Sequence, residues 1–272
     1  LKHSQRYGDG RIHGSVITNA CVSGRCSHRG PNVAQIPRVG QPYGAECRAL
    51  FHAPHGWRQV GCDASGLELR ALGAQLAYFD GGEYSKLVSK EDFDIHTHNA
   101  KLFGIYDGKE EITKSTRELA KRLIYSVLYG GGPFRVGSIL DPSLSERKQK
   151  EIGYETIDTF YKNLPAIKKL KDKVDEKVTQ RGYLIGIDGR HLQIRSRHSA
   201  LNQLLQSTGS LCVKKATCIL YEDCKENHLR WGIHYAFVAH IHDEIQALVK
   251  PQHVSLYKKL SLIHISEPTR HS

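Results

Sequence analysis

Apolar and polar positions along this chain predict strands near both ends and helices between them. Leu69, Leu72 and Leu76 recur at the spacing of one helix face, so residues 67–79 are predicted to be helical. Residues 116–129 predict a second helix, which ends at the glycines of 130–132. Residues 145–180 and 202–221 are also expected to be helical.

Strands are predicted where short apolar or β-branched runs lie between turn-forming residues. Residues 11–37 predict short strands and loops, and 46–62 predict strands around the turn "APHGW". Residues 181–194 predict a hairpin that turns at Asp188-Gly189, and 234–249 read as strand, tight turn, strand. This distribution predicts a sheet domain that carries a helical insertion.

Charge and composition narrow the class of protein. Lys and Arg (39) exceed Asp and Glu (28), and the resulting charge of +11 favours a polyanionic partner. No apolar run is long enough to span a bilayer, and no signal peptide opens the chain. The seven cysteines contain no Cys-x-x-Cys pair, which favours reduced thiols in a cytoplasmic protein.

The two ends of the sequence are unusual. The chain contains no methionine, so we expect that it begins within a longer protein. Its last part, "LSLIHISEPTR", resembles the translation of a sequencing-library adapter. We therefore expect residues 260–272 to be a non-native tail.

Two acidic segments are candidates for chemistry. Asp63 follows the predicted strand that ends in "VGC", where it is either a helix N-cap or a reactive group at a strand end. Asp243 lies in "HIHDEIQ" between apolar runs, at a predicted hairpin tip that is otherwise an ordinary polar turn. If both strands belong to one sheet, the two carboxylates converge and form an oxygen site suited to magnesium.

A helical stripe provides the third candidate. Arg117, Lys121, Tyr125 and Tyr129 follow one another at i, i+4 spacing, so they share one helix face. Two cations followed by two aromatic rings suit the phosphates and the sugar and base of a nucleotide. The alternative is a solvated basic face over an aromatic core contact. Two His-x-His pairs, at 96/98 and 240/242, are weak indicators of zinc, which we discount.

Together the three segments resemble the polymerase motifs of the family A DNA polymerases, and most closely the phage replicative branch. The first motif is "DASGLELR" at 63–70, the second is the stripe with Gly130, and the third is His242-Asp243-Glu244. Further matching segments cover most of residues 8–250 in family order: "GRIHGS", "SGRCSHRGPNVAQIP", "PYGAECRALF", "DGGEY", "DIHTHN" and "DGRHLQIRSRHSALNQLLQS".

The resemblance implies an α+β fold, in which an antiparallel palm sheet carries a helical fingers insertion and the thumb is largely missing. The implied palm comprises residues 1–95, with a thumb edge at 1–10, and residues 183–259; the fingers comprise 96–182.

The resemblance also implies a role for each matched residue. Asp63, Asp243 and Lys121 would be catalytic, and Asp63, Ala64 and Asp243 would hold two Mg²⁺ ions. The residues implied to bind nucleotide are Ser65, Gly66, Leu67, Glu68, His96, Arg117, Lys121 and Tyr125. Those implied to bind nucleic acid are Arg25, Asn32, Gln35, Tyr129, Asn202, Gln206 and His242.

The implied reaction is template-directed addition of dNTPs to a primer 3′-hydroxyl by two-metal nucleotidyl transfer. The implied partners are primer–template DNA, dNTPs and a processivity factor that acts through the missing thumb, with no membrane. The implied location is the cytoplasm of a bacterial host that a phage infects.

Two alternative functions remain, which are a single-subunit RNA polymerase and a catalytically silent DNA-binding fragment. Glu68 argues against the first because it resembles a steric gate against a 2′-hydroxyl; the alternative for Glu68 is an exposed acid at a helix start, which the helix dipole favours.

Overall fold

A computed structural model of the chain describes residue 8 and residues 13–90 and 93–266. The chain divides into two compact units. The first unit comprises residues 1–67 and 207–272, and the second comprises residues 68–206. Each unit is built around its own hydrogen-bonded sheet or hairpin and its own helices.

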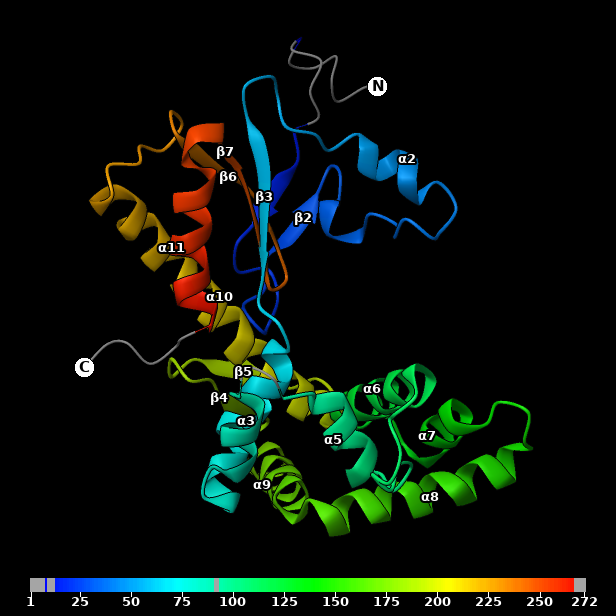
Figure 1. Cartoon of the computed structure of the whole chain (residues 1–272). Coiled ribbons are helices and arrows are strands. Elements are labelled where there is room, and N and C mark those ends of the chain that lie inside the picture. The colour runs from blue at the N-terminus through cyan, green and yellow to red at the C-terminus, as the bar shows by residue number, and fades with distance from the viewer. Residues whose placement is uncertain (1–7, 9–12, 91–92, 267–272) are drawn as a thin grey trace. The chain divides into compact units, whose positions relative to one another are not determined.

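The first unit contains a three-stranded antiparallel sheet in the order β3–β7–β6 (Figure 1). Its strands are β3 (Arg58–Asp63), β6 (Tyr235–Ile241) and β7 (Glu244–Val249). β7 is central, with Asp63 of β3 and Ile241 of β6 both opposite Glu244. The unit also contains a small antiparallel pair, β1 (Ser15–Ile17) and β2 (Ser27–Arg29).

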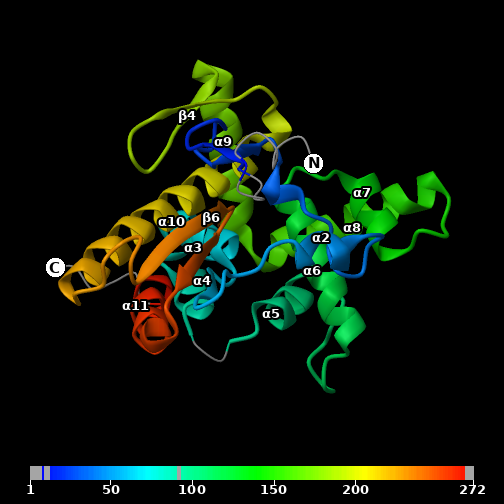
Figure 2. The ribbon, with the colours of Figure 1, turned by 90° about the horizontal axis from the view of Figure 1, so that it is seen from above.

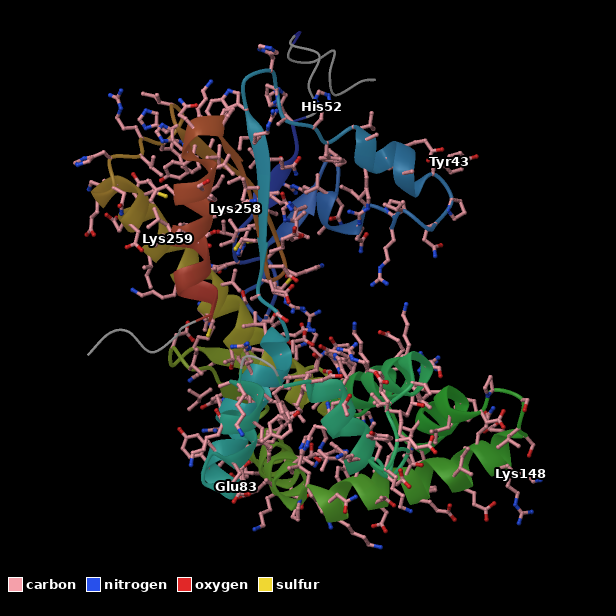
Figure 3. All side chains as sticks on the ribbon, viewed as in Figure 1. Tyr43, His52, Glu83, Lys148, Lys258 and Lys259 are labelled. Carbon is pink, nitrogen blue, oxygen red and sulfur yellow. The ribbon has the colours of Figure 1, made fainter. Side chains whose placement is uncertain are left out.

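Helices cover one face of this sheet. α11 (Val254–Ser266) runs beside β3 in Figure 1, and Leu220 and Cys224 of α10 (Ala200–Glu226) belong to the same buried cluster as Tyr257 of α11. The buried cluster between helices and sheet includes Val60, Leu220, Tyr235, Val249 and Tyr257. The basic side chains of Lys258 and Lys259 project from α11 (Figure 3). The remaining elements are η1 (Val33–Gln35), α2 (Gly44–Ala49) and η3 (Pro251–His253).

The second unit is mainly helical. Its elements are α3 (Leu67–Asp80), α4 (Glu83–Val88), α5 (Ile95–Leu102), α6 (Lys114–Leu128), α7 (Pro133–Leu140), α8 (Glu146–Asn163), α9 (Pro165–Arg181), β4 (Tyr183–Ile185), β5 (His191–Gln193), η2 (Arg197–Ser199) and the start of α10. α5 and α6 lie side by side in Figures 1 and 2.

Local sequence signals explain the ends of these helices. The Thr113 side chain accepts a hydrogen bond from the Thr116 N–H and caps α6, and the Asp94 side chain caps α5 in the same way at His96. Leu164 leaves helical geometry before Pro165, and Pro165 begins α9, so the predicted helical region 145–180 is divided into two helices.

The fold class is confirmed: helices and antiparallel strands make up an α+β chain. The helices at 67–79, 116–129 and 202–221 and the hairpins at Asp188-Gly189 and at 234–249 are also confirmed. The strand predicted before the "APHGW" turn, residues 46–52, is wrong: Ala45, Glu46 and Arg48 are good helix formers and belong to α2, and residues 50–52 are not in a strand.

The predicted subdomain boundaries and the tail stay predictions. The expected fingers, residues 96–182, lie inside the second unit. α11 continues past residue 260 to Ser266, with Leu260 and Ser261 buried. Apart from residue 8, the expected thumb edge lies outside the described residues, as do tail residues 267–272.

Candidate active site

Three carboxylates meet at one end of the three-stranded sheet in the first unit. Asp63 is the last residue of β3 and lies opposite Glu244, the first residue of β7. Asp243 belongs to the two-residue turn that joins β6 to β7. The Ala64 N–H donates a hydrogen bond of 3.2 Å to the main-chain oxygen of Asp243, which ties the end of β3 to this turn. Carboxylates 180 positions apart in sequence therefore lie at the same sheet end, as predicted.

The three carboxylates place negative charges close together, and the described part of the first unit does not compensate these charges with ion pairs. Burial raises the pKa of Asp63, and the nearby charges of Asp243 and Glu244 raise it further. Within the first unit as described, no Lys or Arg side chain forms an ion pair with any of the three. The cluster thus favours a bound cation.

Neighbouring residues on β3 and β7 hold Glu244 in place. The Gln246 amide donates to the Glu244 carboxylate and accepts a 3.0 Å hydrogen bond from the Gln59 amide. Gly61 leaves the space for this pair, since a Cβ there would lie 2.6 Å from Gln246 Nε2 and 2.9 Å from Glu244 Oε1. A side chain at position 61 would therefore displace the ends of the Gln246 and Glu244 side chains from this arrangement.

The turn that carries Asp243 is fixed from both sides. His242 adopts a φ of 56°, in the left-handed region that two-residue hairpin turns use. His28 Nε2 donates a 2.9 Å hydrogen bond to the main-chain oxygen of His240, two residues before the turn. The β6 end is therefore held by β2 as well as by β7.

Asp63 does not cap the helix that follows it. α3 begins at Leu67, and the residue before it is Gly66, whose φ of +62° makes the turn from strand to helix. The capping interpretation is wrong because three residues separate the carboxylate from the first helical turn. Ser65 and Gly66 are exposed, and Leu67 packs beside a small cluster of Ala64, Val213 and Ile245.

The donor set at this sheet end fits magnesium. Carboxylate and main-chain carbonyl oxygens are the hard ligands that Mg²⁺ prefers. In the described ranges, no group of three or more His, Cys, Asp or Glu side chains has the arrangement of a metal cage. Mg²⁺ at phosphoryl-transfer sites is usually bound by one or two carboxylates together with substrate phosphates and water. Asp63, Asp243 and the Ala64 carbonyl could supply such a partial site.

A second group of candidate residues lies in the second unit, on α5 and α6. Arg117, Lys121 and Tyr125 follow one another along α6, and Tyr129 is the residue that ends the helix. Lys121 is exposed, Tyr125 is half-buried, and the Tyr125 and Tyr129 rings lie 5.8 Å apart between centroids. The predicted stripe is therefore present, with its cations at the N-terminal end.

His96 on α5 belongs to the same group. Burial lowers its pKa, and so do the positive charges of Arg117 and Lys121, which lie near enough to act on it. The Nδ1 atom of His96 is buried and has no hydrogen-bond partner among the described residues. The structure thus brings together three of the residues that the resemblance assigned to nucleotide binding.

Arg117 is held by a residue that sequence analysis did not single out. Its Nε donates to Asp94 Oδ2 at 2.7 Å, and the same carboxylate accepts from the Thr97 hydroxyl and from the His96 N–H. Burial alone would raise the pKa of Asp94, but these hydrogen bonds outweigh burial and lower it to about 2. Asp94 stands in the quoted segment "DIHTHN", where its spacing is that of a helix cap.

Glu68 is buried rather than an exposed acid at a helix start. It is 9% exposed, and the Tyr129 hydroxyl donates to its Oε2 at 2.7 Å. The exposed-acid alternative is therefore wrong, because Tyr129 from the end of α6 covers this side chain.

The candidate DNA-binding residues are distributed over the two units. Arg25, Asn32, Gln35 and His242 belong to the first unit, where Asn32 also caps η1 by accepting from the Ala34 N–H at 3.2 Å. Asn202 and Gln206, one turn apart on α10, belong to the second unit, as does Tyr129. The Oδ1 atom of Asn202 is buried and has no protein partner among the described residues.

Comparisons with known proteins identify related sequences and folds. The model of the family described as DNA polymerase family A matches residues 1–267. The chain is 38% identical to proteins described as DNA-directed DNA polymerase from Enterobacteria phage T3 and Escherichia phage T7, over 91% of its length and 36% of theirs. It is 29% identical to thermostable DNA polymerase I of Thermus aquaticus, over 87% of the chain and 28% of that protein. The chain thus spans about a third of the phage relatives.

A solved structure has the same fold. It is described as the POL domain of Pol1 from M. smegmatis in complex with DNA primer-template and dNTP. It superposes with a TM-score of 0.78 at 21% identity, over 96% of this chain and 46% of that one. In the part of the chain that the structure describes, no helix is long and apolar enough to cross a membrane.

Proposed function

Because this chain belongs to DNA polymerase family A, we propose that it carries the palm and fingers chemistry of template-directed DNA synthesis. The observation that carries the proposal is the meeting of Asp63, Asp243 and Glu244 at one sheet end. The substrates are dNTPs and a primer 3′-hydroxyl on a template strand. The palm comprises residues 1–95 and 183–259 and the fingers residues 96–182.

Asp63, Asp243 and the main-chain carbonyl of Ala64 hold two Mg²⁺ ions. When bound, magnesium would supply charge that lowers the pKa of the primer hydroxyl and that neutralises the pyrophosphate. The raised pKa of Asp63 supports this assignment, since a cluster of like charges is relieved by a cation. Glu244 lies beside the two ligands and adds to the negative field.

Arg117, Lys121 and His96 bind the triphosphate, and the loop of Ser65, Gly66 and Leu67 contributes to the nucleotide site. The effect of Arg117 and Lys121 on the pKa of His96 supports a shared site. Lys121 neutralises charge on the triphosphate and protonates the leaving pyrophosphate.

Glu68 excludes the 2′-hydroxyl of a ribonucleotide, which favours DNA over RNA as the product. A gate of this kind needs a fixed side chain, and the hydrogen bond from Tyr129 fixes Glu68. Tyr125, one turn beyond Lys121, faces the sugar.

A further set of side chains contacts the primer–template, in part through minor-groove acceptors that all base pairs share. These are Arg25, Asn32, Gln35, Tyr129, Asn202, Gln206 and His242. A processivity factor stays a prediction.

The test combines metal binding with primer extension in Asp63→Asn and Asp243→Asn. Calorimetric titration with Mn²⁺ in the presence of dNTP should give a binding isotherm for the original chain and a strongly weakened one for each variant. Extension of a labelled primer should be abolished in both, while primer–template affinity changes little. Asp172→Asn, an exposed change on α9, is the matched control.

Two results would contradict the proposal. Primer extension by Asp63→Asn at the rate of the original chain would remove the metal-ligand role. An original chain that binds primer–template but does not extend it with Mg²⁺ and all four dNTPs would be the silent DNA-binding fragment instead.

A further inference from the structure

A groove on the second unit lies outside the candidate active site. It has a volume of about 350 Å³ and is bounded by α3, α9, β4 and the start of α10. α9 and β4 are in contact along it. Its apolar floor includes Leu170, Val174 and Leu184, which are all buried.

Three cations lie in a row along one edge of this groove. Lys173, Lys177 and Arg181 are spaced four residues apart on α9, so they share one helix face over about 12 Å. Lys173 pairs with Glu176 at 2.9 Å, but both side chains are about half-exposed, so the pair contributes little and can be exchanged. None of the described residues that line the groove is acidic. The edge is therefore complementary to a row of negative charges.

The lining of the groove also includes an aromatic ring. Tyr78 of α3 is 86% exposed, which is more than any other large apolar or aromatic side chain in the described ranges. Ile185 of β4, which is 47% exposed, also lines the groove. At the end of the cationic row, the Arg181 guanidinium lies 5.1 Å from the centre of the Tyr183 ring. The largely exposed Tyr78 ring and the cationic row therefore line the same groove, with most of the ring area uncovered by this unit.

We propose that this groove binds single-stranded nucleic acid, with phosphates along Lys173, Lys177 and Arg181 and an unpaired base stacked on Tyr78. Proteins that bind single strands without sequence preference combine a cationic track with aromatic platforms for the bases. A duplex fits less well, because its bases are stacked on one another and offer no free face to the ring. The inference goes beyond the proposed polymerase function and does not depend on it, since a chain that cannot extend a primer can still bind a strand here.

The test measures binding of a fluorescently labelled oligothymidylate to the full chain by anisotropy. Tyr78→Ala should weaken binding about fivefold or more, which is the lower end of what stacking one base contributes. Tyr78→Phe keeps the ring and should bind like the original chain. Tyr154→Ala is the matched control, because Tyr154 is also well exposed but lies on α8, away from the groove.

The cationic row has a separate readout. Lys177→Ala with Arg181→Ala removes two phosphate contacts, so the slope of log K against log salt should decrease in magnitude by about 1.4. Lys148→Ala with Lys168→Ala removes the same charge from exposed positions that do not line the groove, and should leave most of the slope (Figure 3 shows Lys148 on α8). Far-ultraviolet circular dichroism verifies that each variant is folded.

Three results would overturn the inference. One is equal weakening by the groove variants and their controls, which would indicate binding elsewhere on the chain. Another is competition by a blunt duplex as strong as by the single strand. The third is displacement by polyglutamate together with no effect of Tyr78→Ala, which would indicate a site for an acidic protein instead.

Discussion

The ion pair between Asp94 and Arg117 should be measurable as a stability contribution that depends on pH. Asp94→Asn removes the charge but keeps an oxygen that can accept from the His96 N–H, so the cap of α5 is retained. The variant therefore keeps the cap but removes the charged contact with Arg117 at 2.7 Å, together with the oxygen that accepts from the Thr97 hydroxyl, and the cycle with Arg117→Gln below isolates the charged contact.

The size of the effect follows from the pKa and the exposure of the pair. A fall of the Asp94 pKa from 3.8 to about 2 would correspond to about 2.4 kcal/mol if water did not screen the charges. The Arg117 and Asp94 side chains are 40% and 36% exposed, and pairs with such exposure contribute at most about 1 kcal/mol. We expect Asp94→Asn to lower the free energy of unfolding at neutral pH by about 1 kcal/mol.

The sign of the pH dependence is fixed by linkage. The folded pKa of Asp94 lies below its unfolded value, so its contribution is fully present above about pH 4 and is lost as pH falls toward about 2. The difference in unfolding free energy between the original chain and Asp94→Asn should therefore shrink over this interval. Urea unfolding followed by circular dichroism measures that difference at each pH.

A double-mutant cycle with Arg117→Gln separates this pair from other effects. We expect a coupling energy of about 1 kcal/mol at neutral pH and of about zero at the acid end of the interval. A coupling energy near zero at neutral pH, or a difference that stays constant as pH falls, would refute the reasoning.

Three further predictions concern the second unit. Tyr125→Phe should increase discrimination against dideoxynucleotides in primer extension, because the tyrosine hydroxyl can fill the place of the missing 3′-hydroxyl; equal selectivity in the two proteins would show that the side chain does not reach the sugar. Tyr129→Phe removes the donor to buried Glu68 and should destabilise the chain by about 1–3 kcal/mol in urea unfolding, and an unchanged midpoint would exclude a structural role for that hydroxyl. Phe160→Ala should cost about 3–5 kcal/mol by the same measurement, because Phe160 is fully buried and stacked on Phe103 at 4.2 Å; a loss below about 1 kcal/mol would mean that the cavity collapses.

Local signals made much of the fold predictable. Helix α6 could be bounded from sequence because Thr113 caps one end and glycines follow the other. The hairpin of β6 and β7 could be predicted because its apolar residues lie on both sides of a short polar segment. The strand prediction for residues 46–49 is wrong because the pattern of apolar residues in so short a segment does not distinguish a strand from a short helix.

The candidate site was only partly predictable, because its geometry depends on contacts between distant segments. The pairing of β3 with β7 joins Asp63 to Glu244 across most of the chain, and no local periodicity encodes that register. The resemblance supplied the residue types, whereas the role of Gly61 in accommodating Gln246 required the cross-strand neighbours. The contact of Asp94 with Arg117 was missed for the same reason, since 23 positions separate the two residues.

The Asp94 contact changes how the cationic end of α6 should be understood. Arg117 is oriented by a carboxylate, whereas Lys121 forms no ion pair within the second unit as described. A half-exposed ion pair contributes little, while a phosphate offers a guanidinium two parallel charge-assisted hydrogen bonds. A triphosphate can therefore displace Asp94 at small cost, or bind Arg117 through the donors that Asp94 leaves unused. Under the proposed function, the carboxylate keeps the guanidinium near His96 and Lys121 before a nucleotide binds, and so reduces the conformational entropy that binding would otherwise lose.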